Sequence, residues 1–286
     1  MQLSLSTGSL YHLPLATTFA LARDAGLAGV ELVIGPELLL RGSGYVRALA
    51  EQHSLRLLTV HPPILPLPGW QSLPQIAEKL AWWTLALGAP LAVLHSPRAA
   101  SLTSERGRRY VATVVACHQN LARGGALLTI ENRARFSPQE PPGALDDPQA
   151  LADFVAAQQM AVTLDTSHAA GMGLDPRLAF QRLGSAVRNI HLSDVRARSF
   201  FSGRLFRGVY GASIFQQHQL PGTGTLPLAD FLGSLGRAGY CGVLTLELSP
   251  VALRAWSLGN IRRCLAQSVN FCHQHLADPL LPPVPL

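Results

Sequence analysis

The sequence is poor in cysteine, and its cysteines form no pattern. The four of them follow neither a CxxC motif nor a paired spacing: Cys117, Cys241, Cys264 and Cys272. This spacing excludes a zinc ribbon and gives no disulfide framework. We therefore expect four buried apolar cysteines in a protein of a reducing compartment.

Long apolar runs are missing as well. The longest apolar stretch, residues 80–94, is interrupted by Gly88 and Pro90 and is shorter than the roughly 20 residues that a membrane span needs. The first fifteen residues lack the basic segment and apolar segment of a secretory signal. These features predict a cytoplasmic protein with no membrane span.

Charge is scarce and mostly of one sign. Charged residues make up 14% of the chain and hydrophobic residues 48%, which excludes an intrinsically disordered protein. The 23 lysines and arginines exceed the 17 acidic residues, giving a formal charge of +6. This excess favours an anionic partner, either a phosphorylated metabolite or a nucleic acid. A basic surface without such a partner is the alternative.

Short β-rich runs alternate with helical patterns along the whole chain. Strands are predicted at residues 3–7, 29–34, 56–61, 91–95, 126–131, 160–165, 187–192 and 242–247. Apart from a longer last interval, successive strands start about one βα unit apart. Eight such units predict an α/β protein folded as a single (β/α)8 TIM barrel.

Helical spacing of apolar residues fills the intervals between these strands. Helices are predicted just before Gly26 and at 72–87, 104–123, 148–158, 176–184, 227–238 and 251–275. No step in composition divides the chain, so we expect one domain over residues 1–276, followed by a proline-rich surface tail at 277–286. A doubly wound enzyme of two domains is the alternative.

Six of the predicted strands end on a residue that can bind a metal or move a proton. These residues are His61, His95, Glu131, Asp165, His191 and Glu247. The carboxyl ends of barrel strands converge on one mouth, where barrel enzymes have their active sites. His168, three residues after Asp165, and His218, ahead of the last strand, join the same mouth. One such residue is ordinary in a loop, but six at equivalent positions indicate a functional site.

A cation would make this cluster stable. Carboxylates and imidazoles packed together repel one another or change protonation unless a metal ion holds them. Three carboxylates and one imidazole form a mixed oxygen and nitrogen ligand set: Glu131, Asp165, His191 and Glu247. Such a set suits Mn²⁺, Co²⁺, Zn²⁺ or Mg²⁺, and the absence of cysteine argues against a structural zinc.

The segments at the strand ends resemble those of a known superfamily. They are HPP from 61, LHSP from 94, TIEN from 129, LDTSH from 164, HLSD from 191, HQLPGTG from 218 and GYCGVLTLEL from 239. Together they resemble the xylose isomerase-like TIM barrel superfamily, which contains sugar isomerases, epimerases and the endonuclease IV enzymes (AP endonuclease family 2). The resemblance covers nearly the whole chain.

The opening LSLSTGSL and the segment DAGLAGVEL are similar to the isomerase and epimerase branch in particular. This resemblance implies a metal-dependent isomerase or epimerase of a sugar, polyol or sugar-phosphate-like hydroxycarbonyl, with one metal on the four ligands named above. It further implies that Glu131 and Glu247 are the acid/base pair. His168 would contact one substrate oxygen, and Arg196 or Arg198 another.

The endonuclease branch is the alternative. That resemblance implies a phosphodiesterase acting on abasic DNA, with up to three zinc ions and with His61, His95 and His218 as additional ligands. Gln216 stands where that branch has an aspartate two residues before the last loop histidine. This departure argues against a third ion.

The long interval before the last strand combines basic and aromatic residues. The segment contains Arg196, Arg198, Arg204, Arg207, Phe200, Phe201, Phe206 and Tyr210. Such a composition is typical of a loop that grips a phosphate or closes over a small substrate. A contact between two copies of the chain is the alternative.

Overall fold

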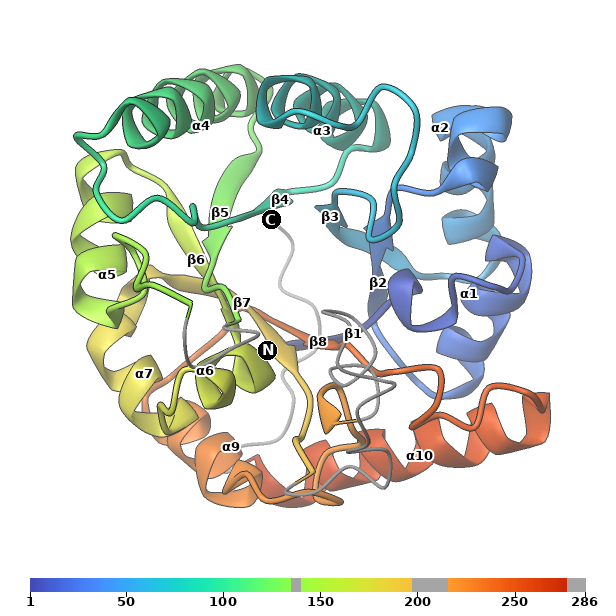
Figure 1. Cartoon of the computed structure of the whole chain (residues 1–286). Helices are drawn as coiled ribbons and strands as arrows, with labels where there is room; N and C mark the ends of the chain where they lie inside the picture. Colours follow the sequence, from blue (N-terminus) through green and yellow to red (C-terminus); the bar gives the residue numbers. More distant parts are fainter. Residues whose placement is uncertain (135–139, 197–215, 277–286) are drawn as a thin grey trace, which may run out of the picture.

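The computed structural model describes residues 1–134, 140–196 and 216–276. Eight parallel strands close into a barrel in the order β1 to β8, with β8 pairing back to β1. Helices surround this barrel (Figure 1). The prediction of a single (β/α)8 TIM barrel is therefore confirmed. The predicted tail at 277–286 lies outside the described residues.

The strands lie within one residue of their predicted bounds. They are β1 Gln2–Ser6, β2 Gly29–Val33, β3 Arg56–His61, β4 Leu91–His95, β5 Leu127–Glu131, β6 Ala161–Asp165, β7 Val187–Leu192 and β8 Val243–Leu246. One difference concerns the site: β8 ends at Leu246, so Glu247 follows the strand instead of ending it.

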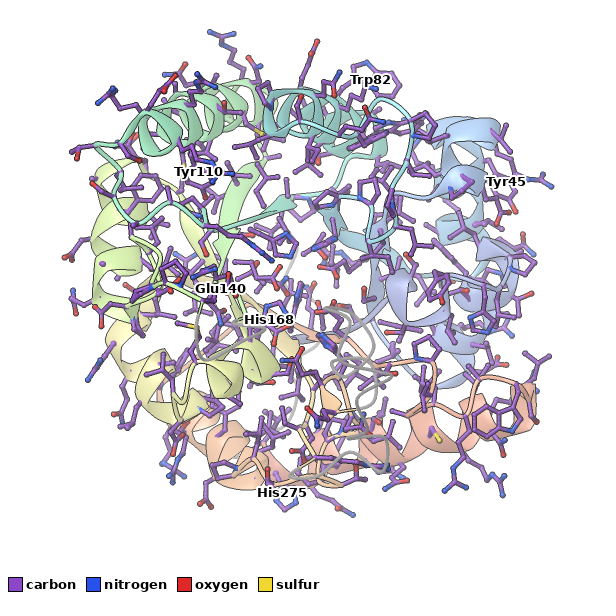
Figure 2. The ribbon with its side chains drawn as sticks, in the orientation of Figure 1. Tyr45, Trp82, Tyr110, Glu140, His168 and His275 are labelled. Atoms are coloured by element: carbon purple, nitrogen blue, oxygen red, sulfur yellow. The ribbon has the colours of Figure 1, made fainter. Side chains whose placement is uncertain are left out.

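The helices cover the outside of the barrel. They are α1 Leu15–Asp24, α2 Pro36–Gln52, α3 Leu73–Leu87, α4 Glu105–Arg123, α5 Pro148–Ala157, α6 Thr166–Gly171, α7 Pro176–Leu183, α9 Leu228–Arg237 and α10 Leu258–His275, with 3-10 turns η1 Thr7–Leu10 and η2 Gly184–Ala186. No helix among the described residues has the length and apolar character of a membrane span. Figure 2 shows Trp82 at the outer rim of α3, whereas His168 lies near the mouth of the barrel.

Two helices differ from the sequence-based expectation. Helix α2 was not predicted, because Gly42 and Gly44 interrupt its pattern, and Gly42 indeed kinks the helix with a φ of 79°. Helix α10 begins at Leu258, not at residue 251. A turn precedes it, in which Arg254 adopts a φ of 50° and the Ala255 amide donates to Pro250 O.

A layer of hydroxyl and amide groups fills the barrel beneath its mouth. Ser4 and Thr245 hydroxyls lie 2.7 Å apart, and Thr245 donates to Asn189. Thr129 and Thr163 hydroxyls are also 2.7 Å apart. Four of these residues stand two positions before Glu131, Asp165, His191 or Glu247, on the same face of their strands. Because the layer satisfies its own hydrogen bonds, it gives the site a rigid polar floor.

Gly107 is a position where the backbone leaves no room for a side chain. An added Cβ would overlap Ser101 O and lie 2.5 Å from Leu102 Cα. Gly107→Ala should therefore lower the free energy of unfolding by about 1 to 3 kcal/mol. Gly44→Ala is the matched control, because a Cβ there meets nothing within 4 Å and should be neutral or stabilise α2. Urea unfolding measures both, and equal stabilities would contradict the prediction.

Candidate active site

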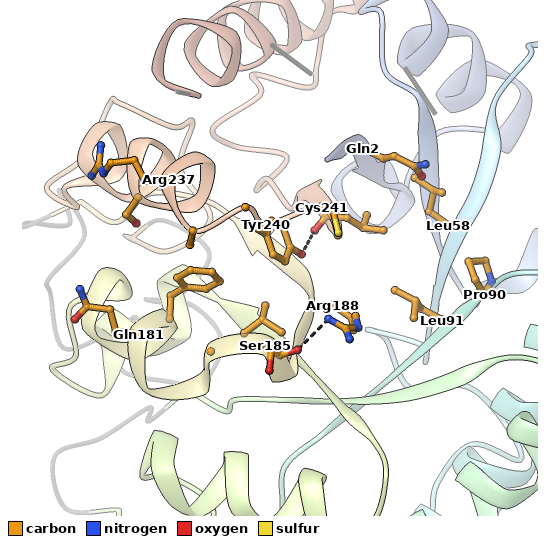
Figure 3. Close-up of a pocket in the computed structure, with 18 residues that line it drawn as sticks. Gln2, Leu58, Pro90, Leu91, Gln181, Ser185, Arg188, Arg237, Tyr240 and Cys241 are labelled. Carbon is orange, nitrogen blue, oxygen red and sulfur yellow. Dashed lines mark hydrogen bonds between the residues drawn. The ribbon is translucent and has the colours of Figure 1, made fainter. Parts of the chain in front are cut away.

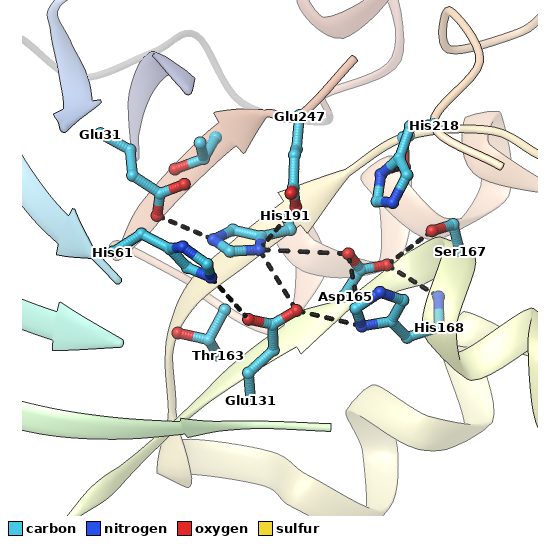
Figure 4. Close-up of polar contacts among 12 residues, drawn as sticks. Glu31, His61, Glu131, Thr163, Asp165, Ser167, His168, His191, His218 and Glu247 are labelled. Carbon is cyan, nitrogen blue, oxygen red and sulfur yellow. Dashed lines mark hydrogen bonds and ion pairs between the residues drawn. The ribbon is translucent and has the colours of Figure 1, made fainter. Parts of the chain in front are cut away.

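The structure brings the predicted strand-end residues together at the barrel mouth (Figure 4). His61, His95, Glu131 and Asp165 end their strands, His191 is the penultimate residue of β7, and Glu247 follows β8. Most of them are buried, since Glu131 is 1% exposed and both Asp165 and His191 are 0% exposed. The exceptions are the side chains of His95, with 47% exposure, and Glu247, with 22%.

His191 lies at the centre of this cluster. Its Nδ1 atom is 2.8 Å from Glu247 Oε2, 3.6 Å from Glu131 Oε1 and 4.0 Å from Asp165 Oδ2. Three carboxylates from separate strands therefore face one ring nitrogen.

Each of these four residues has a buried atom that lacks a hydrogen-bond partner among the described residues. The four atoms are Glu131 Oε2, Asp165 Oδ2, His191 Nδ1 and Glu247 Oε2. Burying polar atoms without partners is unfavourable. One ligand atom from each residue can be chosen so that all four lie within 4.8 Å of one another. A divalent cation bound among them would give partners to Asp165 Oδ2, His191 Nδ1 and Glu247 Oε2, and Glu131 faces His191 with its Oε1 atom, so the residues present fit a metal ion.

Asp165 is oriented for this task by its own backbone. Its Oδ1 accepts hydrogen bonds from the His168 amide at 2.8 Å and from the Ser167 hydroxyl at 3.0 Å, which caps α6. Asn132 connects the neighbouring strand end, since its Oδ1 accepts from the Asp165 amide at 2.7 Å. These contacts leave Oδ2 facing the cluster.

Two further groups of ligand atoms adjoin the central one. Glu131 Oε2 lies 3.6 Å from His61 Nε2 and 3.5 Å from His95 Nε2. On the other side, Asp165, His168 and His218 bring ligand atoms within 4.8 Å of one another. The mouth thus contains every residue that the sequence predicted for it, except those in the arginine-rich segment.

Comparison with known families agrees with this arrangement. The family model described as xylose isomerase-like TIM barrel matches residues 19–264. The chain belongs to the xylose isomerase-like TIM barrel family.

Similar proteins match over almost their whole length. An uncharacterized protein of Mycobacterium tuberculosis is 26% identical over 292 residues, covering 96% of this chain and 98% of that protein. Among solved structures, D-allulose 3-epimerase from Methylomonas sp. superposes with a TM-score of 0.68 at 14% identity, covering 96% of this chain and 97% of that one. The probable 3-DHS dehydratase AsbF from Bacillus anthracis gives 0.68 at 16% identity, covering 94% and 98%. At such identities the structures show a shared fold.

The ionisable groups of this cluster shift one another's pKa. Burial alone lowers the pKa of His168, but the carboxylates of Asp165 and Glu131 outweigh burial and raise that pKa to about 10. Burial likewise opposes protonation of His191, yet nearby Glu31 and Glu247 hold its pKa well above the usual value. In the metal-free chain, protons on these imidazoles balance the carboxylates, and a divalent cation would displace protons from its ligands.

The turn at Gly222 and Gly224 organises the loop that carries His218. Both glycine amides donate to Asp194 Oδ2, at 3.1 Å and 2.8 Å. Asp194 also pairs through its backbone with Gln219, the residue after His218. His218 itself adopts a φ of 53°. Because Asp194 uses these amides, the turn anchors the His218 loop to the end of β7.

The arginine-rich segment is described only at its start. Arg196 is exposed, and its amide donates to Gln216 O at 2.8 Å. Arg198 and the other basic and aromatic residues of this segment lie outside the described residues. The idea of a loop that closes over the substrate therefore stays a prediction.

Sequence reasoning missed Glu31, which lies within β2 and contacts His191 from inside the barrel. Its Oε2 atom accepts a hydrogen bond from His191 Nε2 at 2.8 Å. Glu31 was not predicted because the candidates lie at strand ends and in loops, whereas Glu31 lies within a strand. The available signal was a single acidic residue within the apolar strand GVELV, because lone charges are rarely buried without a partner.

A cavity of about 840 Å³ lies at the opposite end of the barrel (Figure 3). Its lining includes Gln2, Leu91 and Val243 at or near the starts of their strands. In barrel enzymes of this kind, the amino-terminal face contributes to stability and the carboxyl-terminal face to catalysis. The cluster around His191, at the carboxyl-terminal face, is therefore the candidate active site, and this cavity is not.

Proposed function

We propose that this chain is a metal-dependent isomerase or epimerase of a sugar, polyol or sugar-phosphate-like hydroxycarbonyl substrate. The observation that carries the proposal is the placement of Glu131 and Glu247. Figure 4 draws these two carboxylates on opposite sides of the His191 ring, and both approach its Nδ1 atom. Of two carboxylates at one metal centre, one can remove a proton from the substrate and the other can return a proton to a different atom or face.

Glu131, Asp165, His191 and Glu247 would hold one divalent ion: Mn²⁺, Co²⁺, Zn²⁺ or Mg²⁺. Bound there, such an ion would polarise the carbonyl and adjacent hydroxyl oxygens of the substrate and acidify the C–H bond between them.

The side chains around the ion divide the remaining tasks. One glutamate accepts the proton from carbon, and the other delivers a proton to the neighbouring atom or to the opposite face. His168 Nδ1 donates to Asn132 O at 3.0 Å, which leaves its Nε2 atom for a substrate oxygen. Arg196, which follows β7, and Arg198, which lies outside the described residues, would bind a second oxygen or a phosphate.

The comparisons support a small sugar as the substrate class. The Methylomonas enzyme similar to this chain is a D-allulose 3-epimerase in complex with D-allulose. The positive net charge of the chain, +6, suits an anionic derivative of such a molecule.

Exchange of substrate hydrogen with solvent tests this function. We expect metal-loaded protein in D₂O to introduce deuterium at the carbon next to the carbonyl of its substrate, because the proton passes through a carboxylate that exchanges with water. NMR spectra of a panel of aldoses, ketoses and their phosphates would detect it. Chelator-treated protein is the control and should show no exchange. A panel without exchange, together with cleavage of abasic DNA, would contradict the isomerase proposal.

An endonuclease IV-like phosphodiesterase of abasic DNA is the second candidate. The observation that favours it is the presence of two more ligand groups, His61 with His95 and Glu131, and Asp165 with His168 and His218. These groups would supply sites for additional ions. Gln216, in place of an aspartate, weakens this candidate.

The number of bound ions separates the two candidates. For the isomerase we expect elemental analysis to give one ion per chain, whereas the nuclease needs up to three. Replacing both His61 and His95 with Asn should then leave the single ion in place, since neither belongs to the central group. A stoichiometry that falls by one ion in this variant would instead favour the nuclease.

A further inference from the structure

Glu31 is a buried carboxylate that the proposed reaction does not use. It is 0% exposed inside the barrel. Its Oε2 atom accepts hydrogen bonds from His191 Nε2 at 2.8 Å and from Thr59 Oγ1 at 2.9 Å. Within the described part of the chain, His191 is the one basic side chain that forms an ion pair with it. Burial of a charge is unfavourable, so a carboxylate retained at this position indicates a role for Glu31.

The His191 ring lies between Glu31 and the metal-ligand cluster. An ionised carboxylate can only accept hydrogen bonds, so the proton in the contact with Glu31 belongs to His191 Nε2. The opposite ring nitrogen, Nδ1, faces Glu131, Asp165 and Glu247 at 2.8 to 4.0 Å. A neutral imidazole with its proton on Nε2 has its lone pair on Nδ1, the nitrogen that faces these three carboxylates.

We propose that Glu31 is a positioning residue that fixes the orientation and tautomer of His191, so that Nδ1 binds the metal. This inference rests on the metal centre of the proposed function. A carboxylate hydrogen-bonded to the distal nitrogen of a ligand histidine also raises the basicity of the ligating nitrogen.

Glu31 is itself held in place by the neighbouring strand. Glu31 pairs in register with Thr59 on β3, and the Thr59 hydroxyl donates to the oxygen that also receives His191 Nε2–H. The chain Thr59, Glu31, His191 therefore runs from the wall of the barrel to the centre of the metal site.

Metal affinity of Glu31 variants tests the proposal. Affinity for Co²⁺ and Zn²⁺ is measured by competition with a chromophoric chelator. Glu31→Leu removes the acceptor and should weaken binding about 10- to 100-fold, whereas Glu31→Gln keeps a neutral acceptor and should lose less. Thr59→Val removes the other donor to the same oxygen but leaves the His191 contact intact, so its affinity should fall between those of the wild type and Glu31→Leu. Glu51→Gln, on the exposed surface of α2, is the control and should bind as tightly as the wild type.

Melting of the metal-free variants separates positioning from a role in the core. If Glu31 only balances charge in the barrel, Glu31→Leu will shift the melting temperature of the metal-free protein and keep the wild-type metal affinity, which overturns the inference. A wild-type protein that binds none of Mn²⁺, Co²⁺ and Zn²⁺ overturns both the inference and the proposed metal centre.

NMR of the wild-type protein gives a second readout that needs no variant to fold. In zinc-loaded protein labelled with ¹⁵N-histidine, we expect His191 to be coordinated through Nδ1 and protonated at Nε2. Coordination through Nε2 would overturn the proposal.

Discussion

Adding a divalent metal to metal-free protein should raise its melting temperature by about 8 to 16 °C when the free metal is about a thousandfold above Kd. Binding that is confined to the folded state contributes about 4.1 kcal/mol at that concentration. In a protein of this size, each kcal/mol corresponds to about 2 to 4 °C. The folded state offers four ligand atoms within 4.8 Å, a geometry that the unfolded chain lacks. Thermal melts of chelator-dialysed protein with Mn²⁺, Co²⁺, Zn²⁺ and Mg²⁺ measure the shift.

Asp165→Asn is the variant that isolates the ligand role in this experiment. The asparagine oxygen can still accept from the His168 amide and the Ser167 hydroxyl, as Asp165 Oδ1 does, while the ligating Oδ2 is replaced by an amide. We expect most of the metal-induced shift to disappear without a lower melting temperature of the metal-free form. Glu51→Gln, on the exposed surface of α2, should keep the full shift. Identical melting of the wild type with and without metal would refute the metal centre.

The sequence was sufficient for the barrel and for most of its mouth, and the reason is geometric. Short apolar runs one βα unit apart can satisfy their backbone and bury their faces as a closed parallel barrel. That closure brings His61 of β3 and Glu247 after β8 to one end, although 186 positions separate them. Residues at strand ends therefore need no contact information to be recognised together.

The contacts of residues inside the barrel could not be predicted without the structure. Glu31 contacts His191 across 160 positions, and nothing in its local sequence names that partner. Helix α2 was not predicted because Gly42 and Gly44 interrupt the helical pattern of its sequence. Packing against the barrel stabilises this helix despite the two glycines. The floor residues were within reach of sequence reasoning, since Thr129, Thr163 and others stand two positions before a site residue and so share its face.

Replacing either central glutamate should have the largest effect on turnover. General acid/base catalysis contributes about 10²- to 10⁴-fold, so Glu131→Gln and Glu247→Gln should each lower kcat by at least that factor, even at saturating metal. The bound metal is measured in the same samples, which separates loss of the ion from loss of proton transfer. Glu51→Gln serves again as the control and should keep the wild-type kcat.

The two variants should also differ from each other if the reaction is an epimerisation. Each glutamate then serves one face of the substrate carbon, so each metal-loaded variant should still remove the proton from one epimer and fail with the other. Exchange in D₂O, started separately from each epimer, would reveal this asymmetry. Equal exchange from both epimers in both variants would show that neither glutamate transfers the proton, because a residue confined to metal binding has no reason to distinguish the two faces.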